Sequence, residues 1–540
     1  MTNFIRERII YNAEKFPNKI AVRIIYENNI HEITYSRLIN RIKQYKELLN
    51  DNSSKLVVLF LSTDIESYIL IYSCFYYGVI PLIQTYNPKD SSYELLKGKF
   101  KKLSEYYPDI SLGLILGHEH NNIYTLTNSN YENINKLKDV GLIQLSSGTT
   151  DFPKAIKTSF KALENNLLKC KKSWMINENS KIFSWLPISH CFGFLTGVLL
   201  PLYTSSEVTI INPKDFYENP NIWLKTVSRY KNSHAFLPNF ALDHIINNLN
   251  LIKKDNEIID LTSLEILGIG GEFITEKSVL NFYNNFNKYG LKYSAFKSVY
   301  GMSENSGIIT TTDYLETLNF QKINKNNLFI PKNYDFTKNE TTVANVGSIF
   351  ENESILIDFN GDIVDKELYV GEIIISTNSL ADGYLNDLYE RKNNDDFIKY
   401  NNMNYFKTGD LGFLYKNHVY LLGRKKDIII IRGKNFSPYV LENVISNNIN
   451  IDDAKVVVSS ISDDDNLYVL IDTHHRDVEN IKEKLKNIMK DNFDFVIKDT
   501  NILIDYNFLP ITSAKKIDRI QCKKIIMERD VQYEEDKSKN

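Results

Sequence analysis

Cysteine is scarce in this sequence of 540 residues. The four cysteines lie far apart and form no Cys-x-x-Cys pair; they are Cys74, Cys170, Cys191 and Cys522. This spacing argues against a zinc site or a disulfide framework, and it favours a reducing compartment, so we expect a cytoplasmic protein.

An excess of one charge is also lacking. The 64 Lys and Arg residues nearly balance the 67 Asp and Glu residues, which leaves a net charge of −3. A protein that binds the phosphate backbone usually carries a surplus of positive charge, so nucleic acid is not expected as a partner. Hydrophobic residues make up 43% and charged residues 24%, which is typical of a globular protein and argues against a disordered or fibrous chain.

No apolar run is long enough to predict a membrane span. The most apolar stretch, residues 68–83, is short for a span and closely follows Asp64 and Glu66, so a buried core helix is the better interpretation. The chain starts with charged residues where a signal peptide would need an apolar run.

The order of apolar patterns predicts an α/β fold. Short apolar runs alternate with helical patterns in the first half of the chain, which predicts parallel-type sheets with helices on their faces. After about residue 347 shorter strands and turns predict a small β-rich subdomain, and the tail carries a smaller α+β pattern whose end, 534–540, is expected to fray. In the first half we expect strands at 56–61, 79–83, 182–186, 208–211 and 264–268, and a helix at 65–77.

Residues 145–154 carry the sharpest chemical signal. They read Leu-Ser-Ser-Gly-Thr-Thr-Asp-Phe-Pro-Lys, which combines a flexible glycine, four hydroxyls and a cation. Backbone N–H groups, hydroxyls and a lysine in such a turn can cradle anionic oxygens. The segment lacks the Gly-Lys-Ser/Thr of a Walker motif, and a polar surface turn is the alternative interpretation.

Four later segments are weak signals when taken singly. In residues 299–304, Glu304 follows a tight turn and could hold a magnesium ion, and Tyr300 could stack on a purine. In 405–411, Asp410 could accept hydrogen bonds from both hydroxyls of a ribose, although a plain turn would look the same. Residues 423–433 place charges beside a buried strand, and a solvated strand entry would look the same. Residues 509–519 place a lysine in a short loop, for which a surface charge run is the alternative.

Taken together, in this order and at these separations, the five segments resemble the adenylate-forming superfamily of acyl-CoA synthetases, peptide-synthetase adenylation domains, luciferases and fatty acyl-AMP ligases. The resemblance covers nearly the whole chain, from Ala21 to Arg519. The chain looks most like a fatty acyl-AMP ligase, on the evidence of residues 184–190, 199–203, 238–241 and 427–435.

The resemblance implies a large N-terminal domain over residues 1–424 and a small mobile C-terminal lid over residues 425–540. Residues 312–346 are long for a plain loop and fall where fatty acyl-AMP ligases carry an insertion, which is thought to limit domain movement and to disfavour transfer to CoA.

The implied reaction has two steps. A carboxylic acid, expected to be a fatty acid, reacts with ATP and Mg²⁺ to give acyl-AMP and pyrophosphate, and the phosphopantetheine thiol of a free-standing acyl carrier protein then takes the acyl group. The alternatives are an acyl-CoA ligase, an amino-acid adenylating enzyme and a non-catalytic relative that binds nucleotide or acyl groups. Cys191 stands where both fatty acyl-AMP ligases and amino-acid adenylating domains usually have aspartate. Unless another acid substitutes, its absence argues against an α-amino acid, because the ammonium group needs a counter-charge.

The resemblance also assigns roles to residues. Lys516 is the principal cation, although Lys515 replaces the usual glycine and either lysine could enter the site; His190 lies near the carboxylate pocket, or else is a structural residue. Thr149, Thr150 and Lys154 hold the β- and γ-phosphates, Glu304 holds magnesium, Asp410 and Arg424 fix the ribose, and Lys426 is the hinge. Tyr300 and the turn Gly270-Gly271-Glu272 line the adenine slot, and the nucleotide site also includes Ser146, Ser147, Gly148, Gly301 and Ser303.

The resemblance places four residues in the acyl pocket: Phe236, Leu237, Pro238 and Asn239. Long-chain ligases usually carry small residues where this chain has Phe236 and Leu237. Large side chains there would shorten or bend an acyl tunnel, so we expect a medium-length or otherwise unusual acyl substrate.

Overall fold

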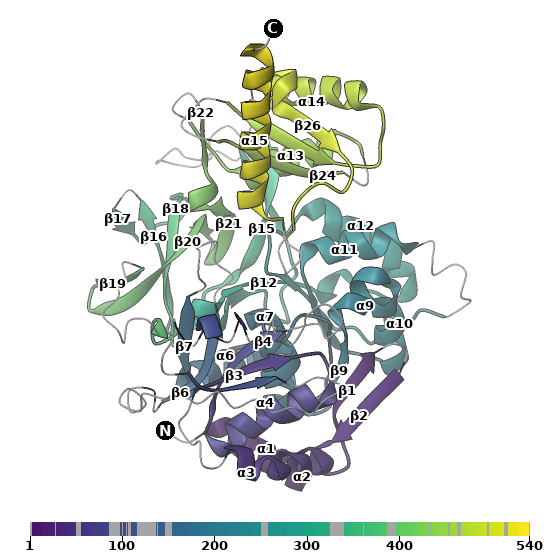
Figure 1. The fold of residues 1–540 in the computed structure, drawn as a ribbon, viewed down its shortest axis with the longest axis vertical. Helices are drawn as coiled ribbons and strands as arrows, with labels where there is room; N and C mark the ends of the chain where they lie inside the picture. The colour runs from purple at the N-terminus through teal and green to yellow at the C-terminus, as the bar shows by residue number, and fades with distance from the viewer. Residues whose placement is uncertain are drawn as a thin grey trace.

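The computed structural model describes most of the chain. The described residues are 3–26, 29–49, 56–85, 98–99, 101–103, 105, 110–115, 137, 139–145, 154–249, 258–324, 340–359, 361–385, 396–431, 434–451, 454–461, 466–493, 496–511 and 517–538. They form two larger sheets with helices packed against them, and a smaller unit built by the C-terminal residues (Figure 1).

A five-stranded sheet lies in the first part of the chain. Its strand order is β5 (Ile110–Ile115), β3 (Leu56–Leu61), β4 (Ile80–Thr85), β6 (Val140–Leu145) and β7 (Ala155–Ser159). The first four strands are parallel and β7 is antiparallel to β6. Helix α4 (Ile65–Tyr77) is as long as expected, because Asp64 caps its first turn and Gly78, at φ +73°, ends it. Helix α6 (Phe160–Ser173) follows β7 directly.

A sixteen-stranded sheet forms the centre of the molecule. One half is mostly parallel, as predicted: β2 (Asn29–Thr34), β1 (Ile20–Tyr26), β9 (Glu207–Ile211), β8 (Lys181–Ser184), β10 (His234–Leu237), β11 (Ile266–Gly270) and β12 (Phe296–Met302). Its helices are α1 (Phe4–Lys15), α2 (Tyr35–Gln44), α3 (Lys46–Leu49), α7 (Cys191–Phe194), α8 (Leu200–Thr204), α9 (Pro213–Glu218), α10 (Asn221–Tyr230), α11 (Asn239–Asn247) and α12 (Glu276–Phe286). The strand expected at 264–268 lies two residues later, as β11.

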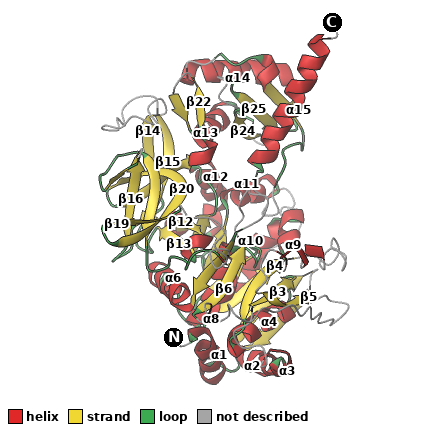
Figure 2. Cartoon of the chain, turned by 60° about the vertical axis from the view of Figure 1, so that its left-hand side comes forward, coloured by secondary structure: helices red, strands yellow, loops and turns green. Residues whose placement is uncertain are grey.

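The other half of this sheet is antiparallel and contains the predicted β-rich part (Figure 2). It comprises β13 (Gly307–Thr311), β14 (Phe320–Asn324), β15 (Glu340–Ser348), β16 (Ser354–Phe359), β17 (Asp362–Val364), β18 (Gly371–Ser376), β19 (Phe397–Tyr400), β20 (Met403–Tyr415) and β21 (His418–Arg424). It joins the parallel half through β12 and β13, which are antiparallel neighbours.

The C-terminal residues have a sheet and a core of their own. Strands β24 (Lys455–Ser459), β25 (Tyr468–Asp472) and β26 (Ile502–Asp505) pack with α13 (Pro438–Asn448), α14 (Val478–Phe493) and α15 (Arg519–Ser538), at the top of the molecule in Figure 1. Helix α15 continues to Ser538, and the expected fraying of residues 534–540 stays a prediction. The short β22 (Ile429–Ile431) and β23 (Lys434–Phe436) connect β21 to α13.

Among the described helices, none combines the length and the apolar character that a membrane crossing requires. The cytoplasmic location stays a prediction.

A buried histidine in β10 makes stability depend on pH. His234 is 1% exposed; its Nε2 donates to the carbonyl of Trp174 (2.9 Å), and the hydroxyl of Ser233 lies 2.8 Å from its Nδ1. Burial lowers the pKa of His234 to about 4, although the hydrogen bond to Trp174 opposes the shift. In the unfolded chain this histidine binds a proton below about pH 6.5, whereas in the folded chain it stays neutral down to about pH 4. The free energy of unfolding therefore falls by about 3 kcal/mol between these two pH values.

When the pH is lowered from 7 to 5, the free energy of unfolding is expected to fall by about 2 kcal/mol less in His234→Gln than in the wild type. Urea unfolding followed by tryptophan fluorescence at both pH values measures the difference. Equal losses for the two proteins would contradict this assignment, because other titrating groups are common to both.

Candidate nucleotide site

Two side chains, one from a neighbouring strand and one from a distant segment, hold a buried carboxylate. Asp410 in β20 lies opposite Arg424 in β21, and the guanidinium Nε is 2.8 Å from Asp410 Oδ1. The hydroxyl of Tyr300, from β12, donates to Asp410 Oδ2 at 2.7 Å. Each carboxylate oxygen can accept more than one hydrogen bond, so this group can still accept the two hydroxyls of a ribose.

Burial and charge oppose each other at this carboxylate. Burial raises the pKa of Asp410, while the positive charge of Arg424 and the hydrogen bond from Tyr300 act to lower it. The pKa of Tyr300 lies well above its usual value because the ring is buried and faces Asp410. Tyr300 therefore stays protonated near neutral pH and acts as a hydrogen-bond donor.

A second buried acid shapes the turn before Asp410. Glu372 in β18 accepts hydrogen bonds from the backbone N–H of Gly409 (3.0 Å) and from Lys425 Nζ (2.8 Å). Gly409 has φ +71°, which favours glycine. Glu372 was not predicted from the sequence; the available signal was an acid at the edge of the apolar run 373–375, where an unpaired charge would be costly.

Glu304 lies on the neighbouring side of the site. It sits in the 3₁₀ turn η7 (Ser303–Asn305) after β12, and the Tyr384 hydroxyl donates to its Oε1 at 3.4 Å. Burial raises the pKa of Glu304, and the charges of Arg424 and Lys154 act against that shift. Glu304 therefore lies within the electrostatic reach of both predicted nucleotide-binding cations.

Lys154, directly before β7, reaches the same region. Its Nζ lies 4.5 Å from the ring centre of Tyr384 and 2.9 Å from Asp396 Oδ2. Tyr384, which is 6% exposed, thus contacts both Lys154 and Glu304. Sequence reasoning missed Tyr384 because Ala-Asp-Gly-Tyr looks like an ordinary turn.

The donor set limits which metal the site can hold. No group of three or more His, Cys, Asp or Glu able to hold a metal occurs within the described ranges. A single carboxylate such as Glu304 fits Mg²⁺, which usually keeps waters and is bound by one or two carboxylates together with substrate phosphates. The residues present therefore fit a magnesium ion delivered with a nucleotide.

The glycine turn expected at the adenine slot lies beside Tyr300. Gly270 ends β11 next to Val299, and a Cβ at Gly270 would stand 2.3 Å from the Val299 carbonyl oxygen, so the two backbones touch. Gly271 has φ +82°. The carboxylate of Glu272 accepts from the backbone N–H of Phe240 at the start of α11, so this acid ties the turn to that helix.

Gly301 and Ser303 follow Tyr300 along the chain. A Cβ at Gly301 would lie 2.2 Å from the Gly307 carbonyl oxygen, because β12 and β13 approach closely at a bulge. Ser303 opens the turn η7 that carries Glu304.

The predicted acyl-pocket residues divide between two faces of the sheet. The Phe236 ring packs 4.7 Å from the ring of Trp174, and a Cβ at Gly268 would collide with it. Leu237 belongs to the separate core cluster around Trp185. Because neighbouring strand residues point to opposite faces, only one of the two can line a given tunnel.

Two more predicted residues follow these strands. Asn239 begins α11 and accepts a hydrogen bond from the backbone N–H of Thr275 at 3.1 Å; Pro238 precedes it as the cap of that helix. His190 precedes α7, and its Nδ1 lies 4.0 Å from the sulfur of Cys191.

Several predicted residues lie outside the described residues: Ser146, Ser147, Gly148, Thr149, Thr150, Lys515 and Lys516. The predicted hinge residue, Lys426, is described and lies in the 3₁₀ turn η9 (Lys425–Asp427), directly after β21.

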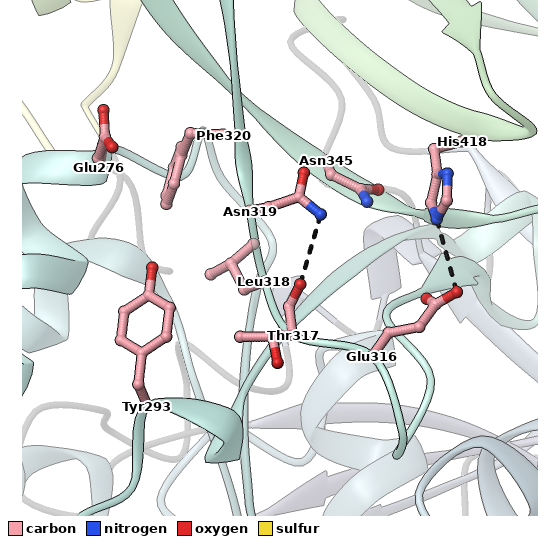
Figure 3. Close-up of a pocket in the computed structure, with 9 residues that line it drawn as sticks. All are labelled: Glu276, Tyr293, Glu316, Thr317, Leu318, Asn319, Phe320, Asn345 and His418. Carbon is pink, nitrogen blue, oxygen red and sulfur yellow. Dashed lines mark hydrogen bonds and ion pairs between the residues drawn. The ribbon is translucent and has the colours of Figure 1, made fainter.

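A separate cavity of about 590 Å³ lies away from this site (Figure 3). It is lined by Glu276, Tyr293, Glu316, Thr317, Leu318, Asn319, Phe320, Asn345 and His418. None of the predicted site residues lines it, and Tyr293 lies just before β12 whereas Tyr300 lies near the other end of that strand. The convergence of charged side chains around Asp410 is therefore a better guide to the chemistry than this cavity.

Comparisons with known proteins identify related sequences. A family model described as AMP-binding enzyme matches residues 89–385. The medium-chain-fatty-acid–[acyl-carrier-protein] ligase JamA of Moorena producens is 27% identical, over 71% of this chain and 67% of that protein. The probable long-chain-fatty-acid–AMP ligase FadD30 of Mycobacterium tuberculosis is 24% identical, over 71% of this chain and 69% of that protein.

Solved structures share the fold over nearly the whole chain. A structure from a study of fatty acyl-adenylate ligases from E. coli and L. pneumophila superposes with a TM-score of 0.79 at 20% identity, covering 98% of both chains. The fatty acid AMP ligase from Legionella pneumophila gives a TM-score of 0.71 at 25% identity, covering 97% of this chain and 96% of that one.

Proposed function

The chain belongs to the AMP-binding enzyme family, and we propose that it activates a fatty acid with ATP and passes the acyl group to an acyl carrier protein. The predicted resemblance to adenylate-forming enzymes, and to fatty acyl-AMP ligases in particular, is confirmed. The observation that carries the proposal is the buried Asp410 carboxylate, held by Tyr300 and Arg424 beside Glu304. Enzymes that form adenylates use ATP.

In the first step a carboxylate oxygen of the fatty acid attacks the α-phosphorus of ATP. The bond from the α-phosphorus to the bridging oxygen breaks, and pyrophosphate leaves with that electron pair. Two anions must meet, so positioned cations and N–H donors are needed to stabilise the transition state. Lys154 and the segment 146–150 hold the phosphates, Asp410 and Arg424 hold the ribose, and Lys516 stabilises the reacting groups. Magnesium, bound by Glu304 and the phosphates, would neutralise charge on the triphosphate.

In the second step the sulfur of the acceptor thiol attacks the acyl carbonyl carbon, the thiol loses its proton, and AMP leaves. Residues 1–424 hold the adenylate, and residues 425–540 rotate about Lys426 between the steps. The position of Lys426 directly after β21 supports this division, because a hinge works best between rigid elements.

A carrier protein is the preferred acceptor. The name of JamA specifies acyl carrier protein, which supports this choice for a relative of this chain. The expected insertion contributes the hairpin of β14 and β15, and Thr341 Oγ1 in β15 lies 3.4 Å from Asn443 Nδ2 in α13. The insertion thus touches the C-terminal residues that would move, which fits the expected restriction against CoA.

Pyrophosphate exchange with a ladder of fatty acids tests the first step, and mass spectrometry of the released adenylate identifies the acid. Incubation of the loaded enzyme with a phosphopantetheinylated carrier protein, and separately with CoA, tests the second. Thioester on CoA alone would favour the acyl-CoA ligase, and no exchange with any acid would favour a non-catalytic relative.

Phe236 is proposed to set the length of the acyl tunnel. We expect Phe236→Ala to move the optimum of pyrophosphate exchange toward longer acids, because removal of a buried ring leaves space beside Trp174. Leu237→Ala is the matched control, since that residue is equally buried but belongs to the other face. An unchanged optimum in Phe236→Ala, or a wild-type optimum at about sixteen carbons or more, would contradict the medium-length proposal.

A further inference from the structure

The turn that carries Glu304 is held by a buried asparagine from a different part of the chain. Asn166 lies on α6 and is fully buried. Its Nδ2 donates to the carbonyl oxygens of Asn305 (3.1 Å) and Ile308 (2.8 Å), and its Oδ1 accepts from the backbone N–H of Ile308 (3.1 Å). These three hydrogen bonds go to the backbone that directly follows Glu304; the Cys170 thiol, one turn further along α6, also lies 3.9 Å from Asn166 Oδ1.

This stretch of backbone has a conformation that needs such support. Ser306 has φ +56° and Gly307 has φ +133°, both in the region that L side chains rarely adopt. A Cβ at Gly307 would lie 3.0 Å from Asn166 Oδ1, so the amide packs directly against the turn. Asn166 therefore serves as a template for a sharp turn between Glu304 and β13.

Residues 377–384 hold the same turn from its other side. The Thr377 hydroxyl donates to the side-chain oxygen of Asn305, the Ser306 hydroxyl donates to the carbonyl of Ser379 at 2.7 Å, and the backbone N–H of Ala381 donates to the carbonyl of Glu304 at 2.8 Å. The support is thus two-sided.

Helix α6 and residues 377–384, which hold the turn, are both connected to β7, the strand that follows Lys154. Residues 382 and 383 exchange backbone hydrogen bonds with Lys157 in β7 (2.8 and 2.9 Å), and β7 begins directly after Lys154. Helix α6 continues from the end of the same strand. The position of Glu304 relative to Lys154 is therefore set by one connected set of contacts, in which Asn166 supplies three hydrogen bonds.

We propose that Asn166 is a positioning residue that places the Glu304 carboxylate for the magnesium ion of the ATP complex. The inference rests on the proposed function, because it needs Glu304 to be the metal-binding acid. Magnesium demands near-ideal octahedral geometry, so a small displacement of its carboxylate weakens binding. Groups that orient a metal ligand commonly change metal affinity by 10- to 100-fold when they are removed.

The test is a calorimetric titration of a non-hydrolysable ATP analogue at a series of Mg²⁺ concentrations. In Asn166→Ala, we expect the Mg²⁺ concentration that gives half-maximal enhancement of analogue binding to rise about 10-fold. Affinity for the analogue without Mg²⁺ is expected to stay unchanged, because Asn166 does not touch the ribose-binding residues. The assay requires no turnover.

Asn12→Ala is the matched control. Asn12 in α1 is equally buried, donates to the carbonyl of Leu202 at 2.8 Å and accepts from the Ser205 hydroxyl at 2.6 Å. It makes no contact with the Glu304 turn, so its loss is expected to lower stability without changing the Mg²⁺ dependence. An equal shift in Asn12→Ala would overturn the proposal, because the effect would then be general destabilisation.

Thr377→Val is a second variant, for use if Asn166→Ala does not fold. It removes the hydroxyl that holds Asn305 from the opposite side, and the same direction of shift is expected. Unchanged Mg²⁺ dependence in the folded variants, or an equal loss of affinity with and without Mg²⁺, would overturn the proposal. Failure of the proposed function would instead appear as absent pyrophosphate exchange in the wild type, which leaves the calorimetric result readable.

Discussion

Lys516→Ala is expected to abolish adenylate formation while ATP still binds. The ammonium group stabilises negative charge that develops as the carboxylate reaches the α-phosphorus, so it acts mainly in the transition state. Loss of one such donor costs about 10²- to 10³-fold in rate. Pyrophosphate exchange measures the loss, and calorimetry with the non-hydrolysable ATP analogue checks that nucleotide binding survives.

The neighbouring lysine provides the matched control. The described residues on either side of 512–516 lie close together, because Ile511 and Ile517 form a bridge and the Asp518 N–H donates to the Pro510 carbonyl at 2.8 Å. Lys515→Ala changes the same short segment by the same charge, and we expect it to retain most activity. The reverse pattern would assign the catalytic role to Lys515, and full activity in both variants would reject a lysine from this segment.

Asp410→Asn is expected to lower kcat/KM for ATP by about 100-fold. The substitution keeps the shape of the side chain, but it removes the charge that pairs with Arg424 and leaves an amide group facing that guanidinium. Hydrogen bonds to a charged acceptor are stronger than those to a neutral one, so the ribose loses affinity as well. The loss should appear mainly as a raised KM for ATP in pyrophosphate exchange.

A second acid–arginine pair controls for simple destabilisation. Glu207 pairs with Arg23 across β9 and β1, with 13% and 10% of the two side chains exposed. Glu207→Gln therefore disturbs a comparable pair in a different part of the sheet, and we expect an unchanged KM for ATP. A similar rise in KM in both variants would contradict a ribose-binding role for Asp410.

The elements with strong local signals could be predicted from the sequence. The strand at 56–61 is a run of six apolar residues, and the helix at 65–77 has a capping aspartate before it and a glycine after it. The antiparallel continuation of the central sheet had no comparable signal, because β12 and β13 pair through contacts that depend on the whole fold.

The candidate site shows the same division. Asp410, Arg424 and Glu304 were identified by their place in family motifs. Asp410 and Arg424 meet across one hairpin, β20 and β21, whereas Tyr300 and Glu304 come from a segment more than one hundred residues earlier. Glu372 and Tyr384 were missed because each looks ordinary within its own segment. The assignment of Phe236 and Leu237 to one pocket ignored the two-residue period of a strand, which alone separates them onto opposite faces.

The place of Arg424 at the end of β21 has a consequence for the order of events. Arg424 is fixed within the sheet by its pairing with Asp410, and the proposed pivot begins only after it. A rotation of residues 425–540, as proposed above, would therefore leave Asp410 and Arg424 in place around the nucleotide half of the intermediate. An acyl-adenylate is a mixed anhydride that water readily hydrolyses. Continued binding of its ribose by Asp410 and Arg424 during the rotation would keep the intermediate in the site until the thiol reaches it.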